Sequence, residues 1–388
     1  MLNISDRIYL SPPHMSGEEL AKIAEAFASN WIAPLGPMVE QFERQISELV
    51  GIEGTVALCS GTAAIHLALE LAGVQEGDIV FCSSLTFVAS VNPIRYLGAE
   101  PVFIDSEPTT WNMSPRALER ALYEANMLGQ LPKAVIVVHL YGQCADMDAI
   151  MKICRQYGIC VIEDAAEALG ATYKGQMAGT IGDYGIYSFN GNKLITTSAG
   201  GALVSNYSDK LEYARYLSAQ AKLPAYHYEH SQVGYNYRLS NILAAIGCSQ
   251  LNVIDERIAL RRAVFERYQQ ALGDRPGISF MPDPLWGSST RWLTTLTLDP
   301  HLIEASPLDV VQELEVMNIE SRRVWKPMHA QPLFAGCRYY RHEENESVSD
   351  MLFERGICLP SGSSLAIDDQ NRVIDGVQSA LRPIYSLS

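Results

Sequence analysis

The sequence lacks any uninterrupted apolar run of the ~20 residues that a membrane-spanning helix needs. Its N-terminal stretch, MLNISDRIYLSPPH, also lacks a basic segment followed by an apolar one. The eight cysteines are scattered without a CxxC pair, which argues against a disulfide framework or a zinc site and predicts reduced, structural thiols. We therefore expect a cytoplasmic protein with no membrane partner and no bound metal.

Basic residues are scarce, with 29 Lys and Arg against 44 Asp and Glu and a net charge of -15. A polyphosphate would be repelled over most of such a surface, so nucleic acid is not an expected partner. A single anionic small molecule is still compatible with a local basic pocket. The 388 residues are 48% hydrophobic and 19% charged, which is typical of a globular chain long enough for two domains that share one cleft.

Short apolar runs alternate with helical patterns between about residues 55 and 205. The runs are TVALC, DIVFC, EPVFID, KAVIVVHL, GICVIED, DYGIYSF and GALVS. Each is nearly continuous in apolar residues, as strands buried on both faces of a mostly parallel sheet are. The intervening helical patterns end at Gly73 and Gly158. The sequence therefore predicts an α/β fold with ligands at the C-terminal ends of the strands.

The pattern changes after about residue 250. A long charged helical stretch, LNVIDERIALRRAVFERYQQAL, leads into the Gly/Pro-rich PGISFMPDPLWGSS. Strand-like RWLTTLTL, a helix starting near Ser306 and a closing helix near 367–381 follow. We expect a large α/β domain over residues 1–250, including the N-terminal segment, and a smaller α+β domain over residues 251–388.

Three segments carry candidate chemistry. In CSGTAAIHLAL a strand ends, Ser60-Gly61-Thr62 turns and a helix begins, so free N–H groups and the positive end of the helix dipole suit a phosphate. The alternative is that Ser60 or Thr62 only caps the helix.

The second segment is VIEDAAEALG, in which a buried strand delivers Glu163 and Asp164 to the edge where ligands bind. The alternative role of Asp164 is that of a helix N-cap.

The third segment is SFNGNKLITTSAGG, where Lys193 follows a strand in a small, polar turn. A solvated loop lysine is the alternative explanation. In combination, a lysine amine, a strand-end aspartate and a phosphate-binding helix start indicate pyridoxal phosphate. The amine forms a Schiff base with the aldehyde, and the aspartate keeps the ring nitrogen protonated.

The order SGTAA, TFVAS, EDAAEALG, SFNGNK, GG and GYNYRLS resembles the DegT/StrS-type nucleotide-sugar aminotransferases. The resemblance extends from SPPHMSGEEL through WKPMH to ICLPSG. It implies the aspartate-aminotransferase-like fold type I of pyridoxal-phosphate enzymes, with a mostly parallel seven-stranded sheet between helices and a smaller C-terminal α+β domain. Relatives that dehydrate sugars carry histidine in place of the lysine, so Lys193 favours transamination.

Carried over to this sequence, the resemblance implies that Lys193 is the Schiff-base lysine and the acid/base, and that Asp164 pairs with the pyridine nitrogen. Glu167, where many relatives have Gln, would lie near the 3-hydroxyl of the cofactor. Phe87 would cover the ring face, with a core phenylalanine as the alternative.

The resemblance also assigns a phosphate site to Gly61, Thr62 and Ser188. Asn236 in GYNYR would reach the phosphate of the neighbouring subunit's cofactor. This implies a homodimer with shared active sites.

For the substrate, NWIAPLGPMVEQFE and RRVWKPMHAQPLF resemble segments of enzymes that aminate C4 of UDP-4-keto-6-deoxy-N-acetylglucosamine in bacillosamine synthesis. The resemblance implies that L-glutamate donates the amino group, giving UDP-4-amino-4,6-dideoxy-N-acetylglucosamine and 2-oxoglutarate for glycan biosynthesis and protein glycosylation. The candidate substrate-binding residues are Asn190, Arg238, Arg322, Arg323, Trp325, Lys326 and His329. The cations among them would bind the diphosphate. Surface salt bridges for the arginines and a structural role for His329 are the alternatives.

Other readings of the chain stay open. GDP-perosamine-type aminotransferases share TWNMS and HLYG, and a 3-keto nucleotide sugar is a further possible acceptor. A non-catalytic regulatory protein with this fold is a second class, although it would have no need of the lysine. A dinucleotide-dependent dehydrogenase is disfavoured because no GxGxxG follows the first strand.

Overall fold

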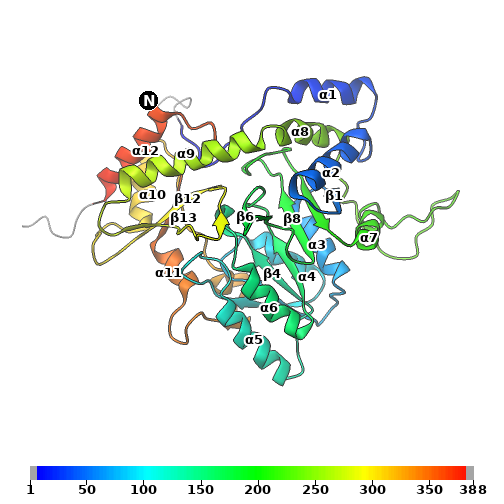
Figure 1. Ribbon diagram of the computed structural model, residues 1–388, viewed down its shortest axis with the longest axis horizontal. Helices are drawn as coiled ribbons and strands as arrows, with labels where there is room; N and C mark the ends of the chain where they lie inside the picture. Colours follow the sequence, from blue (N-terminus) through cyan, green and yellow to red (C-terminus); the bar gives the residue numbers. More distant parts are fainter. Residues whose placement is uncertain (1–6, 382–388) are drawn as a thin grey trace, which may run out of the picture.

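A computed structural model describes residues 7–381, and residues 1–6 of the N-terminal stretch considered above lie outside the described residues. Within the described range, the central layer is an eight-stranded sheet in the order β1-β9-β8-β5-β4-β2-β3-β14 (Figure 1). Its strands are β1 Gly54–Leu58, β2 Ile79–Ser83, β3 Glu100–Ile104, β4 Ala134–Val138, β5 Cys160–Asp164, β8 Tyr184–Ser188, β9 Gly201–Ser205 and β14 Tyr339–Tyr340.

Strand β9 runs antiparallel to both of its neighbours, and the other strands of this sheet run parallel to one another. The apolar runs of the sequence coincide with β1, β2, β3, β4, β5, β8 and β9, which confirms the mostly parallel α/β fold. The two-residue strand β14 is an addition that the sequence analysis missed. It comes from the C-terminal part of the chain and pairs with β3.

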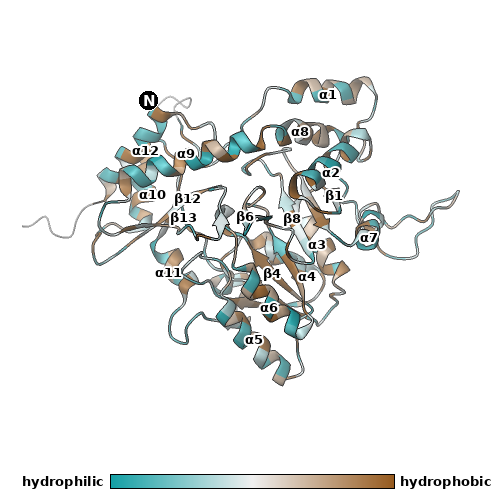
Figure 2. Cartoon of the chain, in the orientation of Figure 1, coloured by the Kyte–Doolittle hydropathy of each residue, from teal (hydrophilic) through white to brown (hydrophobic). Residues whose placement is uncertain are grey.

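Helices cover both faces of this sheet, with α2 Pro37–Val50, α5 Pro115–Met127, α6 Met147–Tyr157 and α8 Asn241–Leu251 on one face. The other face packs against α3 Gly61–Leu71, α4 Asn92–Tyr96 and α7 Ser208–Ser218. Successive strand residues alternate between the two cores: Val161 belongs to the first and Ile162 to the second. Figure 2 shows the apolar strands between helices whose outer sides are hydrophilic. This double burial explains the nearly continuous apolar runs.

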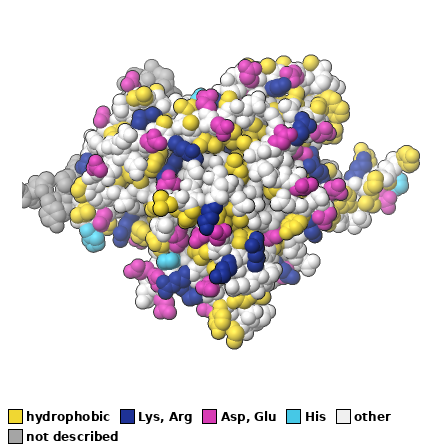
Figure 3. Space-filling model, viewed as in Figure 1, with side chains coloured by type: hydrophobic (Ala, Val, Ile, Leu, Met, Phe, Trp, Pro, Cys, Tyr) yellow, Lys and Arg dark blue, Asp and Glu magenta, His cyan; other side chains and the backbone are white. Residues whose placement is uncertain are grey.

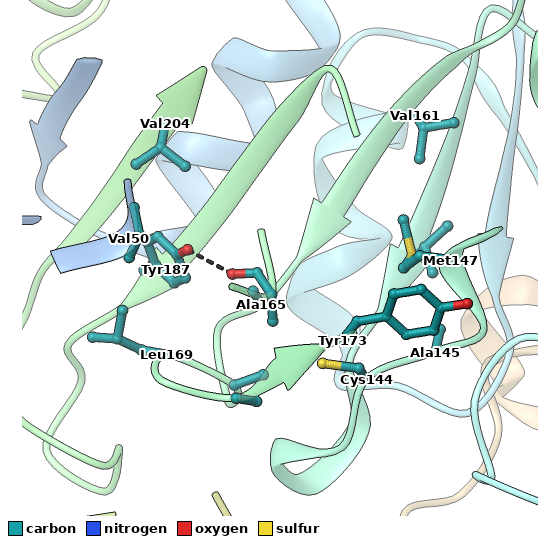
Figure 4. Packing of buried hydrophobic residues seen from close by; sticks show 14 of the residues in the cluster. Val50, Cys144, Ala145, Met147, Val161, Ala165, Leu169, Tyr173, Tyr187 and Val204 are labelled. Atoms are coloured by element: carbon teal, nitrogen blue, oxygen red, sulfur yellow. Dashed lines mark hydrogen bonds between the residues drawn. The ribbon is translucent and has the colours of Figure 1, made fainter. Parts of the chain in front are cut away.

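Figure 4 shows part of the first core at close range, with Val161, Tyr173, Tyr187 and Val204 among its labelled residues. The hydroxyl of buried Tyr187 donates to the carbonyl of Ala178 at 2.6 Å, so its polar atom is satisfied inside the apolar cluster.

The second sheet has four strands in the described residues, in the order β10-β12-β15-β13. These are β10 Ile278–Phe280, β12 Thr294–Leu298, β15 Gly356–Leu359 and β13 Arg322–Arg323. It shares a core with α9 Ile254–Leu272, α10 Pro307–Val316 and α12 Ile367–Ala380. Ile8, from the start of the described chain, bridges to Ile319 and joins this core.

The remaining elements are the helices α1 Glu19–Ala28 and α11 Val348–Arg355 and a small sheet of β6 Thr172–Tyr173, β7 Gln176–Met177 and β11 Gly287–Ser288. No helix within residues 7–381 is long and apolar enough to cross a membrane. On the face drawn in Figure 3, acidic and basic side chains are interspersed over the surface.

Local signals in the sequence explain several of these boundaries. Gly158 ends α6 in the left-handed conformation (φ 65°), and Gly73 follows α3 with φ 77°, as expected of glycines at helix C-termini. Ser306 caps α10 through a capping box with Asp309. The long charged pattern that starts at Leu251 is divided, because α8 ends there and α9 begins at Ile254.

Candidate active site

A cavity of about 1090 Å³ opens at the C-terminal ends of the parallel strands. Ser60, Thr86, Val138, Asp164 and Ser188 lie at or just beyond the ends of β1, β2, β4, β5 and β8, and all of them line it. The opposite wall comes from residues 9–13, 292–293, 320 and 322–326. The edge predicted to bind ligands is therefore a deep cleft closed by segments distant in sequence.

Lys193 lies on the floor of this cleft. Its backbone N–H donates to the carbonyl of Asn190 at 3.0 Å, which closes the turn after β8. Its side chain is 13% exposed, with Nζ 3.5 Å from Glu167 Oε1 and 4.3 Å from the ring centroid of Trp292. The solvated loop lysine of the alternative explanation is thus not what the structure shows.

The turn that carries the lysine is tied down at the carbonyl of Asn192. This oxygen accepts hydrogen bonds from Ser11 Oγ and from Trp292 Nε1, each at 2.7 Å. Arg261, which is fully buried, supports the same assembly by donating to Ser11 Oγ at 3.0 Å and to the carbonyl of Ser361 at 3.0 Å. Burial lowers the pKa of Arg261 to about 9. Three distant segments therefore fix the position of one amine.

Asp164 ends β5 with its carboxylate at the cleft and is 6% exposed. Its Oδ2 accepts from Ser90 Oγ at 2.6 Å, and its Oδ1 accepts from the Ala166 N–H at 3.2 Å. The chain turns after Asp164 and does not enter an α-helix there, so the N-cap alternative is not what the structure shows. The neighbouring Glu163 points to the opposite face of the sheet, as alternation along a strand requires.

Glu167 is the carboxylate nearest to the lysine amine. Its Oε2 accepts from the Tyr141 N–H at 2.8 Å, and the residue is 5% exposed. Burial raises the pKa of Glu167 to about 7, against the opposing attraction of Lys193. This carboxyl group therefore exchanges its proton near neutral pH, beside the amine.

A corner whose groups suit an anion forms where α3 begins. Ser60 caps the helix by accepting from the Ala63 N–H at 3.1 Å, so the capping role holds, and Ser60, Gly61 and Thr62 also line the cleft. A Cβ on Gly61 would lie 3.2 Å from the Ser188 Cβ, so glycine lets the helix start approach the end of β8 closely. The first-turn N–H groups and the hydroxyls of Thr62 and Ser188 suit a phosphate.

Aromatic and basic side chains surround the mouth of the cleft. Phe87 is 56% exposed and lines it, which rules out the core phenylalanine of the alternative reading. Its ring centroid lies 5.8 Å from that of Trp325. The predicted substrate residues Asn190, Arg322, Arg323, Trp325 and Lys326 line the same cleft. A negatively charged chain thus gathers several cations at one opening.

Three predicted site residues lie outside the cleft of their own chain. Arg238 pairs with Glu43 at 3.1 Å, and His329 stacks on Tyr339 with ring centroids 3.6 Å apart. Neither side chain lines the cleft of its own chain, so their binding of substrate stays a prediction. Asn236 is exposed between Tyr235 and Tyr237, whose rings pack near α3.

Sequence reasoning missed several residues of the cleft. Trp292, Thr86 and Ser90 contact Lys193 or the Asp164 network, and Cys358 lines the wall. Two hydroxyls spaced four residues apart just after a strand end were an available signal for Thr86 and Ser90. For Trp292 and Cys358 there was none, because only tertiary packing brings them to the strand ends.

These residues fit pyridoxal phosphate. The cleft joins a half-buried amine, a strand-end carboxylate and a glycine-containing helix start that leaves room for a phosphate. Lys193 would hold the aldehyde carbon, Asp164 the ring nitrogen, and the corner at Gly61 and Thr62 the phosphate.

Comparisons with known proteins agree with this site. The model of the "DegT/DnrJ/EryC1/StrS aminotransferase family" matches residues 13–378. EpsN of Bacillus subtilis, named provisionally as a pyridoxal phosphate-dependent aminotransferase, is 61% identical over 95% of this chain and 94% of its own. GDP-perosamine synthase of Caulobacter vibrioides is 36% identical over 97% and 98%. The provisionally named sugar aminotransferase Spr1654 of Streptococcus pneumoniae, solved in its PLP-form, has a TM-score of 0.86 and 25% identity, with 96% and 98% covered.

Proposed function

The chain belongs to the DegT/DnrJ/EryC1/StrS aminotransferase family, and from that premise we propose that it transfers the amino group of L-glutamate to C4 of a UDP-4-keto-6-deoxy-N-acetylhexosamine. The products would be UDP-4-amino-4,6-dideoxy-N-acetylglucosamine and 2-oxoglutarate. At the coarser level, the chain is a pyridoxal-phosphate-dependent aminotransferase that acts on nucleotide-linked sugars. The observation that carries the proposal is the Lys193 amine, 3.5 Å from Glu167 in a cleft that also presents Asp164.

Each cleft residue has a role in this reaction. When bound, pyridoxal phosphate supplies an aldehyde that takes up amines and a ring that withdraws electrons from the carbon bearing the amine. Asp164 keeps a proton at the ring nitrogen. Lys193 Nζ, once displaced by the amine of the substrate, would take the proton from that carbon and deliver it to the carbon of the cofactor's aldehyde group, and the turn at Asn192 would hold the amine within reach of both.

Glu167 and Trp292 position the Lys193 amine from two sides. Glu167 is a proton partner for Nζ, since its pKa of about 7 lies close to working pH. Trp292 presents its ring 4.3 Å from Nζ, and the hydrogen bond from its indole N–H fixes that ring. Phe87 and Trp325 line the opening through which the planar cofactor and the sugar would enter.

The cations at the mouth support a nucleotide-linked substrate. Arg322 is largely exposed and bonded to Glu320, whereas Arg323 donates to the carbonyl of Phe353 at 2.8 Å. Lys326 is exposed at the same opening. A diphosphate placed between them would gain charge-assisted hydrogen bonds that a free sugar lacks.

A GDP-linked 4-keto sugar is the second candidate acceptor. It is favoured by the 36% identity to the GDP-perosamine synthase of Caulobacter vibrioides. The two candidates share C4 chemistry and differ in the base and in the group at C2 of the sugar.

One experiment separates the acceptors. Purified protein is incubated with L-glutamate and each of a panel of UDP-, GDP- and TDP-linked 4-keto and 3-keto sugars, and amine formation is scored by mass. The UDP-linked N-acetylated 4-keto sugar is expected to give the highest kcat/KM. Higher turnover of a GDP-linked or 3-keto sugar would overturn the assignment of the acceptor. Absence of any product with L-glutamate would overturn the assignment of L-glutamate as the amino donor.

We also propose a homodimer in which Asn236 acts on the partner's cofactor phosphate. The segment between α7 and α8 extends away from the rest of the molecule (Figure 1). On this segment Tyr226, Tyr228 and Val233 are highly exposed, with relative solvent-accessible areas of 112%, 81% and 81%. Apolar side chains on an extended arm are expected to be covered by a second copy. Asn236 lies on this segment, outside the cleft of its own chain.

Mixed dimers test this assignment. Lys193→Ala and Asn236→Ala homodimers are each expected to be impaired. Random mixing should restore activity, because the Lys193-containing cleft of the heterodimer receives Asn236 from the other chain. Mixtures no more active than the average of the two homodimers would contradict sharing of the site.

We further propose that residues 1–250 and 251–388 act as a large and a small domain with the cleft between them. The strand ends supply Asp164 and Lys193, while β13 and the loop after it supply Arg323 and Lys326. Limited proteolysis near residue 250, with and without L-glutamate, would locate such a boundary.

A further inference from the structure

Behind Asp164 lies a chain of two buried hydroxyls. Thr86 Oγ1 and Ser90 Oγ are 2.6 Å apart, and Ser90 Oγ is 2.6 Å from Asp164 Oδ2. Thr86 and Ser90 are each 1% exposed, yet both lie along the wall of the cleft. Neither has a role in the reaction derived above.

The direction of these hydrogen bonds follows from the number of protons available. An ionised carboxylate only accepts, so Ser90 donates its single hydroxyl proton to Asp164. Ser90 then has only lone pairs to offer Thr86, and Thr86 must be the donor of that pair. The result is a one-way chain in which each bond polarises and strengthens the next.

The local fold explains why the two hydroxyls meet. Strand β2 ends at Ser83, and the short 3₁₀ turn Val88–Ser90 follows, closed by a hydrogen bond from the Ser90 N–H to the Phe87 carbonyl at 3.1 Å. The turn brings Thr86 and Ser90 together beside β5, while Phe87 remains exposed at the cleft. One five-residue segment thus shapes the cleft wall and contacts the carboxylate.

We propose that Ser90, supported by Thr86, is a positioning residue that fixes the orientation of the Asp164 carboxylate at the cleft. This inference rests on the proposed pairing of Asp164 with the ring nitrogen of the cofactor. Hydrogen bonds donated to a carboxylate favour its charged form. Ser90 holds Oδ2 and the Ala166 N–H holds Oδ1, so the carboxylate keeps one orientation at the wall of the cleft, where it would accept the proton-bearing ring nitrogen of the cofactor.

The test measures cofactor binding as well as turnover. Apo-protein is titrated with pyridoxal phosphate for the wild type, S90A, T86V and T86S, and the visible absorption band of each reconstituted protein is followed against pH. Loss of a hydrogen bond to a charged group predicts about tenfold weaker binding for S90A. The more remote T86V should weaken binding about threefold. T86S keeps the hydroxyl and should behave as wild type.

The pH titration separates a positioning role from a purely structural one, because a purely structural role would leave the pH midpoint of the visible band unchanged. In S90A and, to a lesser extent, T86V, the pH midpoint of the visible band should move, because the proton is held less firmly on the ring. Ser205→Ala is the matched control: it removes a buried hydroxyl on β9 that donates to the Asp183 carbonyl, and Ser205 does not line the cleft. Should S90A fail to fold, the nearly isosteric pair T86V and T86S decides the question alone.

The double variant separates this inference from the proposed function. In D164A the substitution Ser90→Ala should have no further effect on binding or on the pH midpoint. If D164A itself binds and titrates as wild type, the assigned role of Asp164 is wrong. If D164A is impaired while S90A and T86V match wild type, Asp164 keeps its role and the hydroxyl chain has none.

Discussion

The two carboxylates that end β5 are neighbours in sequence and differ completely in surroundings. Glu163 is fully buried on the face covered by α5 and α6, and its oxygens accept from His139 Nε2 at 2.7 Å and from the N–H groups of Gly179 and Ile181 at 2.9 and 2.6 Å. Gly182 N–H is a further donor. Asp164, on the other face, accepts from Ser90 and Ala166 and borders the cleft.

The difference shows how burial alone fails to identify a functional carboxylate. Glu163 is surrounded by donors from its own chain, so it organises the loop 179–182 and leaves little capacity for a ligand. The Ala145 N–H donates to Nδ1 of His139, so the proton of that ring lies on Nε2 and points at Glu163. Asp164 retains unused lone pairs beside open volume. Changes on the cleft side should therefore reduce catalysis, and changes on the Glu163 side should reduce stability.

The largest effect is expected at Lys193. Lys193→Ala should abolish turnover because it removes the amine proposed to hold the cofactor and move the proton, while the melting temperature and the proposed dimer persist. Lys174→Ala, at an exposed lysine paired with Asp148, is the control and should be as active as wild type. Normal turnover by Lys193→Ala would end the catalytic assignment.

Next in size is Asp164. Asp164→Ala should slow both half-reactions by orders of magnitude, because the ring nitrogen would lose the anion proposed to keep it protonated. Stopped-flow absorbance with L-glutamate, and separately with the keto-sugar, measures each half. An unchanged rate in either half-reaction would contradict the role proposed for Asp164 at the cleft.

Glu163→Gln tests the carboxylate on the other face of the central sheet. The amide NH₂ would meet N–H donors at Gly179 or at Ile181 and Gly182, so the free energy of unfolding should fall by about 3 kcal/mol. Urea denaturation measures this loss. The protein that remains folded should retain near wild-type kcat, and a selective loss of kcat at full stability would show that Glu163 acts in catalysis.

The smallest effect concerns the third carboxyl group, Glu167. Its pKa is raised to about 7 in the folded protein, so the folded state holds a proton that the unfolded state releases near pH 4.5. Stability of the apo-protein should therefore decline as pH rises from about 4.5 to 7, on the order of 2 kcal/mol. Glu167→Gln should remove that decline in urea titrations at several pH values. A variant with the same pH dependence as wild type would show that another group titrates.

Much of the topology of the eight-stranded sheet was predictable because its strands are buried on both faces and read as continuous apolar runs. Residues carried by those strands or the turns after them, such as Gly61, Asp164 and Lys193, were predictable for the same reason. Strand β14 was missed because two residues, Tyr339 and Tyr340, carry no periodic signal. In the sequence, Arg238 cannot be told from a ligand-binding arginine. Only the folded structure shows that its guanidinium forms a salt bridge with Glu43.

Local backbone preference and apolar patterning set the alternation of strands and helices, the glycine at the start of α3, and the succession of the turn at Gly61, Asp164 and Lys193 along the chain. Which neighbours those groups have depends on the packing of the folded chain. This packing placed Trp292 beside Lys193, Ser90 behind Asp164 and donors around Glu163, because hydrogen bonding and desolvation depend on contacts between segments far apart in the chain.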